Sequence, residues 1–382
     1  MASSIYKQDL STQYNPKLGP RLLFFSGGSA LQGLCAELKH VTHNSIHLLN
    51  PFDSGGSSAH LRTAFDMPAV GDLRNRLMGL ADLDQTGVSE TYQLLHYRLS
   101  CTDEASVLLE ELRRIIHARH PLTQGIPQIS LNEICSALHY FAQRMPESFR
   151  LQGASIGNLV MAGTYLENGR NLTASVTSLA KLLCIQGVVE PVTEAPLHLA
   201  VELSSGLRMI GQHLVTGKEF RPLDARIESI WLSECPDRNC PVRPEISEQI
   251  AMEISQADLI CYPPGSFYSS VIANLLPEGI SKAVSGNSAA KVYVPNLGCD
   301  PEQFGMNLEQ QIATLLSVLD ALEEPEQHVL SHLLIDSEQA SELPNQDFLD
   351  RHGIQVIERH LRSSNTPYYD NQKLLKALLE LI

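Results

Sequence analysis

The sequence predicts an α/β fold built on a mostly parallel sheet, with a helical insertion and a small antiparallel β excursion. Short apolar runs alternate with helical patterns along most of the chain, which is typical of parallel strands joined by helical crossovers. Glycine-rich loops at 26–30, 53–58, 153–158 and 263–270 each follow a strand-like run or begin a helical pattern. Because such sheets bind ligands beyond the carboxyl ends of their strands, the four loops are expected to converge on one crevice.

Composition narrows the class of protein. The 382 residues suffice for one large or two medium domains, and 43% of them are hydrophobic. A net charge of −15 argues against nucleic-acid binding, which needs a basic face. No apolar run reaches the roughly 18 residues of a membrane-spanning helix. We therefore expect no nucleic-acid or membrane partner.

Eight scattered cysteines contain no C-x-x-C pair and favour reduced thiols. Cys235 and Cys240 are closest, but without a further Cys or His pair they are a weak zinc signal. The polar N-terminus shows no signal peptide, so a cytoplasmic location is expected. Residues 1–20 have no periodic pattern and are predicted to be a loosely held extension.

The first predicted strand, residues 21–25, runs into Ser26-Gly27-Gly28-Ser29, and a helical pattern follows from Leu31 to Leu38. Strand, glycine turn and helix together place backbone amides beneath a phosphate. The stretch is neither a Walker A loop nor a complete G-x-G-x-x-G, and a simple packing turn would look the same.

The stretch from Asn50 to Asn75 follows a second strand, Ile46 to Leu49. Its glycines allow a close approach to a ligand. Asp53 and Asp72 suit a divalent cation. Acids, bases and glycines together predict a site for a phosphorylated ligand and Mg²⁺, with a solvated surface loop as the alternative. The cations suited to phosphate are Arg62, Arg74 and Arg76.

The middle of the chain departs from strand–helix alternation. Helical patterns at 104–117 and 131–144 predict a helical insertion over about 99–150. The third glycine loop then opens an apolar helix. Short alternating runs predict an antiparallel β excursion over about 188–232.

The last third returns to the α/β pattern. A strand at 258–262 precedes the fourth loop, whose hydroxyl-bearing helix start suits an anion. Later strands are expected at 291–297, 329–336 and 354–361, and a closing helix at 372–382.

Taken together, the loops resemble those of the CofD/YvcK family, which comprises 2-phospho-L-lactate transferases and YvcK-type gluconeogenesis factors. The resemblance runs from about residue 21 to the C-terminus and is nearer the YvcK branch. It implies one three-layer Rossmann-like domain over residues 21–382. The matching segments are Ser26-Gly27-Gly28-Ser29, Asp53-Ser54-Gly55-Gly56-Ser57-Ser58, Gly71-Asp72-Leu73-Arg74-Asn75, Gly153-Ala154-Ser155-Ile156-Gly157-Asn158 and Pro264-Gly265-Ser266-Phe267-Tyr268.

The resemblance also implies functional residues. Asp53 would lie near metal and phosphate, and Asp53, Asp72 and Arg74 are the catalytic candidates. Ser54 stands where the family usually has a second acid. Homodimers are common in the family, so a homodimer is the implied assembly. The ligand-binding candidates are Gly27, Gly28, Ser29, Gly55, Gly56, Ser57, Ser58, Asn75, Ser155, Asn158, Gly265, Ser266 and Tyr268.

Two functions remain open from the sequence, beside a structural scaffold with a vestigial site. The first is binding of a nucleotide or a nucleotide-sugar such as a UDP-sugar, with a metabolic regulatory role. The second is a CofD-like, Mg²⁺-dependent transfer of a phospholactyl-type group from a nucleoside diphosphate donor. Positioning and charge neutralisation would suffice for that transfer, so no covalent nucleophile is required.

Overall fold

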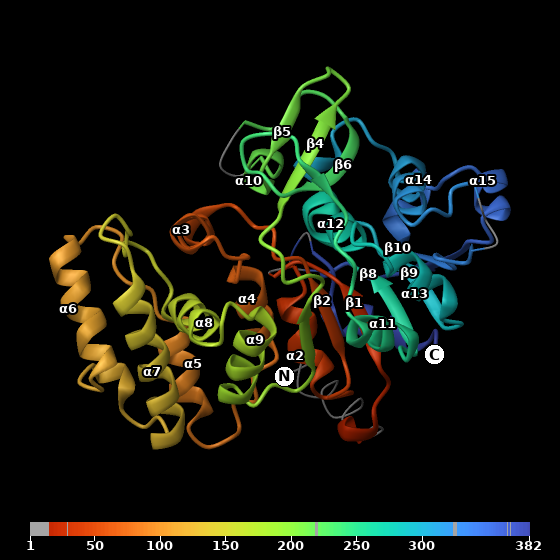
Figure 1. Ribbon diagram of the computed structural model, residues 1–382. Helices are drawn as coiled ribbons and strands as arrows, with labels where there is room; N and C mark the ends of the chain where they lie inside the picture. The colour runs from red at the N-terminus through yellow and green to blue at the C-terminus, as the bar shows by residue number, and fades with distance from the viewer. Residues whose placement is uncertain (1–14, 29, 218–220, 324–326, 365, 367) are drawn as a thin grey trace.

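The computed structural model describes residues 15–28, 30–217, 221–323, 327–364, 366 and 368–382. Its central sheet has seven strands in the order β11-β10-β9-β8-β1-β2-β3, all parallel to their neighbours (Figure 1). This confirms the predicted α/β class. The strands are β1 (Leu22–Phe25), β2 (Ile46–Leu49), β3 (Val188–Pro191), β8 (Leu259–Tyr262), β9 (Ala290–Tyr293), β10 (His332–Asp336) and β11 (Gln355–Arg359).

Strand β1 is an interior strand between β8 and β2, and all four of its side chains are fully buried. Alternate residues point to opposite faces. Leu22 and Phe24 therefore join one hydrophobic core, whereas Leu23 and Phe25 join the other. A strand buried on both faces explains why its sequence is continuously apolar instead of alternating.

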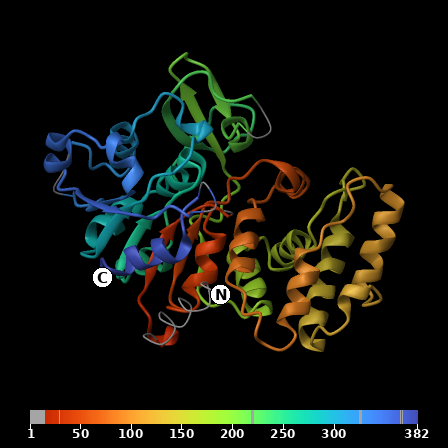
Figure 2. The same ribbon diagram turned by 180° about the vertical axis from the view of Figure 1, so that it is seen from behind.

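Helices supply the apolar surfaces on both faces of the sheet. Figure 2 shows the C-terminal helix beside α2, and the two helices are in contact. One core includes residues of α2 (Gln32–Leu38), α4 (Gly71–Gly79) and α16 (Asn371–Leu379). The other includes residues of α11 (Glu248–Ser255), the π-helix η3 (Phe267–Ile272), α12 (Ala273–Leu275), α13 (Ile280–Gly286), α14 (Leu308–Val318) and α15 (Gln346–Arg351).

The helical region is larger than the predicted insertion at 99–150 and stands to one side of the sheet (Figure 1). Helices α7 and α8 approach closely because of Gly163: a Cβ there would lie 1.9 Å from the carbonyl oxygen of Ala137. The region comprises α5 (Val88–His96), α6 (Ala105–Ile116), α7 (Gln128–Arg144), α8 (Ile156–Glu167) and α9 (Leu172–Leu182).

The antiparallel sheet spans residues 198–242, not 188–232 as predicted, because β3 pairs with β2 in the main sheet. The run at 209–215, one of the short alternating runs of that predicted excursion, also divides: β5 ends at Ile210, and a helix begins after Gly211, whose φ is +117°. The elements are β4 (His198–Leu203), β5 (Arg208–Ile210), α10 (Gln212–Val215), β6 (Ile227–Ser233) and β7 (Pro241–Val242), in sheet order β5-β4-β6-β7.

The predicted extension, residues 1–20, falls partly outside the described residues. Residues 15–20 pack onto the fold: Thr42 donates to the carbonyl of Pro20 at 2.7 Å, and Asn44 donates to that of Gly19 at 2.8 Å. The folded unit therefore includes residues that we assigned to the extension. No helix within the described ranges is long and apolar enough to cross a membrane.

Candidate functional site

A cavity of about 240 Å³ lies beyond the carboxyl ends of β1, β2 and β8. Three of the four predicted glycine-rich loops reach it, together with α10 and the residue after it from the β excursion. The convergence at the strand ends follows from the parallel topology. The lining residues are Gly27, Ala30, Asp53, Gly55, Asp72, Gln212, His213, Thr216, Ser266, Ser269 and Ser270.

Buried Arg76 fixes the loop after β1. Its guanidinium donates to the carbonyl of Gly27 at 2.6 Å, to Ser26 Oγ at 3.1 Å and to Cys35 Sγ at 2.7 Å. Arg76 is only 1% exposed, so these contacts are largely shielded from water. This arginine supports the wall of the cavity and does not reach into it.

Gly28 brings that loop against the start of α4. A Cβ on Gly28 would lie 2.4 Å from Asp72 Oδ1 and 2.6 Å from Asp72 Cα. The glycine is required by this close approach, since its φ is not in the left-handed region. The contact places the Asp72 carboxylate beside the first loop.

Asp53 and Asp72 both face the cavity. Asp53 Oδ1 accepts a hydrogen bond from the amide of Gly55 at 3.0 Å, which fixes its carboxylate. Mg²⁺ commonly takes one or two carboxylates together with substrate phosphates and waters. The two carboxylates match this mode of coordination. No group of three or more His, Cys, Asp or Glu side chains able to hold a metal occurs within the described residues.

The loop after β8 is already capped by protein carboxylates. Asp300 accepts from the amide of Phe267 at 2.7 Å, and Glu302 accepts from the amide of Ser269 at 2.8 Å and from its hydroxyl at 2.5 Å. Burial and the nearby Asp300 charge raise the pKa of Glu302 to about 7. The amides that we expected to hold an anion at this helix start therefore already have acidic partners.

His213 is a cavity residue that sequence reasoning missed. Its Nδ1 lies 2.7 Å from Ser54 Oγ, and its amide donates to the same oxygen at 3.2 Å. Ser54, at the position where the resemblance implies a second acid, thus contacts an imidazole. Because 159 residues separate the two, and His213 falls in a run predicted to be strand, no local signal identified the pair.

The other two arginines of the opening stretch are also buried. Arg62 donates to the carbonyl of Leu197 at 2.7 Å and so ties α3 (Gly56–Phe65) to the segment before β4. Arg74 is 4% exposed and contacts the Gly157 position of α8. Desolvation lowers the pKa of each to about 10, so both stay charged at neutral pH. Neither lines the 240 Å³ cavity.

The remaining candidates lie around the cavity or away from it. Asn158 donates to Ser57 Oγ at 3.1 Å, which joins the third loop to the second. Ser155 is fully buried and donates to the carbonyl of Leu95 at 3.5 Å. Ser58 is buried, Asn75 is half-buried and Gly56 has a positive φ of 47°. Ser29 lies outside the described residues.

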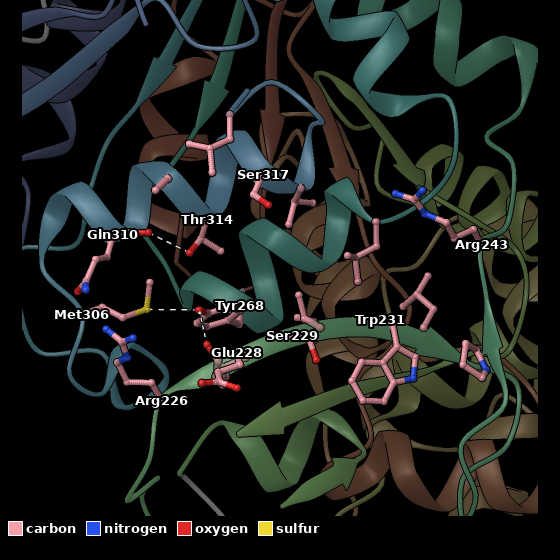
Figure 3. Close-up of a pocket in the computed structure, with 18 of the residues that line it drawn as sticks. Arg226, Glu228, Ser229, Trp231, Arg243, Tyr268, Met306, Gln310, Thr314 and Ser317 are labelled. Atoms are coloured by element: carbon pink, nitrogen blue, oxygen red, sulfur yellow. Dashed lines mark hydrogen bonds between the residues drawn. The ribbon is translucent and has the colours of Figure 1, made fainter. Parts of the chain in front are cut away.

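Gly265 and Tyr268 belong to the fourth loop. Asn296 holds both polar groups of Gly265, accepting from its amide at 2.7 Å and donating to its carbonyl at 2.6 Å. Tyr268 points into a different cavity of about 810 Å³, between β6 and α14 (Figure 3). Its hydroxyl lies 3.4 Å from the carbonyl of Ile227, so it does not face the two aspartates.

The side chains that line the 240 Å³ cavity make it acidic. Its described lining contains two carboxylates and one histidine, but no lysine or arginine. A diphosphate without a bound metal ion would be repelled by the two carboxylates, because like charges in a partly desolvated site interact strongly. A divalent cation held by the two acids would reverse that balance.

Comparison with known proteins gives the family. The family model described as 2-phospho-L-lactate transferase CofD matches residues 22–363. The chain belongs to the CofD family. This confirms the relationship that the glycine loops indicated.

Named relatives belong to the gluconeogenesis-factor branch. The gluconeogenesis factor of Bacillus subtilis strain 168 is 28% identical over 283 residues, covering 74% of this chain and 69% of that protein. That of Listeria innocua serovar 6a is 26% identical over 282 residues, covering 73% and 67% respectively. A crystal structure of a UPF0052 family protein from Bacillus halodurans superposes with a TM-score of 0.69 at 21% identity, covering 95% of this chain and 99% of that one. The fold is thus shared with that protein.

Proposed function

We propose that this CofD-family chain binds the diphosphate of a nucleotide or nucleotide-sugar through a divalent cation held by Asp53 and Asp72. The observation that carries the proposal is the pair of carboxylates in a small cavity whose described lining offers no basic side chain. Such a site suits a metal–phosphate unit better than phosphate alone.

The size of the cavity supports the same assignment. At about 240 Å³ it falls below the roughly 300–1,000 Å³ typical of pockets that enclose a whole drug-sized ligand. It would accommodate the cation and the phosphates, and the base and sugar would extend beyond it. Ser266 and Ser270 supply hydroxyl groups along one wall, whereas the hydroxyl of Ser269 is already donated to Glu302.

The biological role that we propose is regulatory binding in carbon metabolism. The support is the name of the relatives, which are described as gluconeogenesis factors. Binding without turnover also agrees with Ser54, which contributes a hydroxyl at the position where the resemblance implies an acid.

A transferase is the second candidate, favoured by the two aspartates together with His213. In transfer of a phospholactyl-type group from a nucleoside diphosphate donor the P–O–P bridge breaks, and Mg²⁺ would offset the charge of the nucleoside monophosphate that leaves. Asp53 and Asp72 would hold the cation, and His213, oriented by Ser54, could take the proton from an acceptor alcohol. The CofD family match supports this alternative.

Thermal shift and calorimetry test the binding proposal. UDP, GDP and UDP-glucose would each be titrated with and without Mg²⁺, since a ligand at 100 times its Kd stabilises the fold by about 2.7 kcal/mol. We expect stabilisation by at least one of them only when Mg²⁺ is present. Asp53→Asn and Asp72→Asn should each remove it, whereas Asp84→Asn, at an exposed position, should not.

Absence of any Mg²⁺-dependent shift with all three ligands would refute the binding proposal. Turnover separates the two candidates. Release of free nucleotide from a phospholactyl-guanylyl donor in the presence of an acceptor alcohol, lost in His213→Ala, would establish the transferase. Mg²⁺-dependent binding without product would favour the regulatory role.

A further inference from the structure

The loop between β6 and β7 brings two cysteines together. Ser233 and Pro241 form the last register pair of the two strands, and the amide of Glu234 donates to the carbonyl of Cys240 at 3.0 Å. Cys235, near the start of the loop, and Cys240, at its end, therefore lie across the hairpin from each other. Both cysteines are partly exposed, and both are free thiols.

One buried hydroxyl holds both cysteine backbones. Ser233 Oγ accepts from the amide of Cys235 at 3.3 Å and from that of Cys240 at 3.2 Å. It lies 3.0 Å from the carbonyl of Cys235 and 3.2 Å from that of Arg238, the acceptors for its proton. Because Ser233 is fully buried, these bonds hold the backbones of the two cysteines at a fixed separation.

The thiols interact with each other and with a cation. Arg238 Nε donates to Cys235 Sγ at 3.3 Å. A hydrogen bond from Cys240 and the Arg238 guanidinium lower the pKa of Cys235, whereas the same thiol–thiol contact raises that of Cys240. The asymmetry makes Cys235 the better nucleophile and leaves Cys240 protonated beside it.

A zinc site does not account for the pair. Structural zinc takes four ligands. No group of three or more potential metal-binding His, Cys, Asp or Glu side chains occurs among the residues that the structure describes. Two adjacent thiols with a single arginine are instead the arrangement of a reactive cysteine and a resolving cysteine.

We propose that Cys235 and Cys240 form a hydroperoxide-reactive dithiol that closes reversibly to a disulfide. The Cys235 thiolate attacks one peroxide oxygen, the O–O bond breaks, and a sulfenic acid forms as hydroxide or alkoxide leaves. Cys240, losing its proton, then attacks the sulfenic sulfur, forming the S–S bond and expelling water. The peroxide is reduced by two electrons, and the thiol pair is oxidised by two. An external dithiol reverses the reaction by exchange.

Trp231 lies in the same hairpin, so its fluorescence can report the formation of the disulfide. Trp231, the single tryptophan, donates from Nε1 to Asn239 Oδ1 at 2.8 Å within the same hairpin. Trp231, Pro241 and Val242 also line the 810 Å³ cavity, where Figure 3 shows the indole beside Ser229. Closing the disulfide tightens the loop that holds Asn239, so the environment of the indole should change.

The full chain would be treated with stoichiometric hydrogen peroxide and followed by tryptophan fluorescence and intact-mass and peptide-mass spectrometry. We expect a product lighter by two hydrogen atoms, with Cys235 linked to Cys240, a fluorescence change, and full reversal by dithiothreitol. Cys235→Ser and Cys240→Ser should each abolish the linkage. Cys101→Ser, at an exposed cysteine elsewhere, should leave it unchanged.

Arg238→Gln tests the cation separately. It should slow the peroxide reaction at pH 7 by about threefold to tenfold and shift the pH profile of Cys235 alkylation upward. The proposal is overturned if wild-type protein yields no Cys235–Cys240 linkage, or if Cys101 and Cys299 oxidise as fast as Cys235. A Cys235 sulfenic acid that persists beside a reduced Cys240 would also refute it.

Discussion

Substitution of Gly28 by alanine tests the geometry of the candidate site most directly. The new Cβ would lie 2.4 Å from Asp72 Oδ1 and 2.6 Å from Asp72 Cα. The carboxylate could rotate away, but the Cα belongs to the backbone of α4 and cannot. Ordinary carbon–carbon contact begins near 3.5 Å, so the loop and the helix start must separate by roughly 1 Å.

That separation has two measurable consequences. Forcing an extra carbon into a packed region costs about 1–3 kcal/mol of unfolding free energy, which urea denaturation would measure. Displacing Asp72 by about 1 Å should weaken Mg²⁺-dependent binding of UDP by about tenfold to a hundredfold, by analogy with misplaced catalytic groups. Isothermal titration calorimetry in the presence of Mg²⁺ would measure the affinity.

Gly79→Ala is the matched control. Its Cβ would meet Cys35 Cβ at 3.6 Å and Gln32 Cγ at 3.9 Å, both ordinary contacts, at the end of the same helix. It should leave UDP affinity unchanged. If Gly28→Ala also keeps wild-type stability and affinity, the close approach of loop and helix is wrong.

Three further predictions concern the groups around the cavity. Arg76→Met should cost about 3 kcal/mol or more in urea unfolding, because Ser26 and Gly27 lose a charged donor; a loss below about 1 kcal/mol would contradict this role. The pKa of Glu302 is raised to about 7, so the folded state binds its proton more tightly than the unfolded chain does. The contribution of this carboxyl to the unfolding free energy is therefore complete below about pH 4.5 and is lost as the pH rises to about 7. Glu302→Gln should remove up to about 3 kcal/mol of this decrease in unfolding free energy. The contribution of Glu190, whose pKa burial also raises to about 7, remains. An unchanged slope of unfolding free energy against pH between about 4.5 and 7 would count against the assignment. His213→Ala should weaken Mg²⁺-dependent UDP binding about fivefold through loss of the Ser54 hydrogen bond; calorimetry showing wild-type affinity would place that pair outside the binding site.

The buried arginines show why residue type alone misleads about a site. Arg62, Arg74 and Arg76 stand between two aspartates in the sequence or just after them, and that pattern suggested phosphate contacts. Arg62 and Arg76 instead donate to loop carbonyls from the inside, and Arg74 is buried beside Gly157 of α8. Burying a guanidinium is costly unless its donors are paired, and loop carbonyls pair with the terminal nitrogens of Arg62 and Arg76, whereas Arg74 Nε is buried without a hydrogen-bond partner among the described residues.

The α/β class, the buried apolar strands, the glycine loops and the two aspartates could all be predicted from the order of residues along the chain. These features are local: strand β1 is apolar throughout because both faces are covered, and glycine marks the loops where the backbone must come close to a neighbour. Family resemblance added the relationship that the match over residues 22–363 confirmed.

The set of side chains that share the cavity depends on the packing of the folded chain. It brought His213 to Ser54 across 159 residues, and it directed Tyr268 into the other cavity. It also capped the fourth loop with Asp300 and Glu302, which follow it by about 33 residues. Pairings at such distances depend on how sheet and excursion pack together, and no periodicity or short motif in a single chain records that packing.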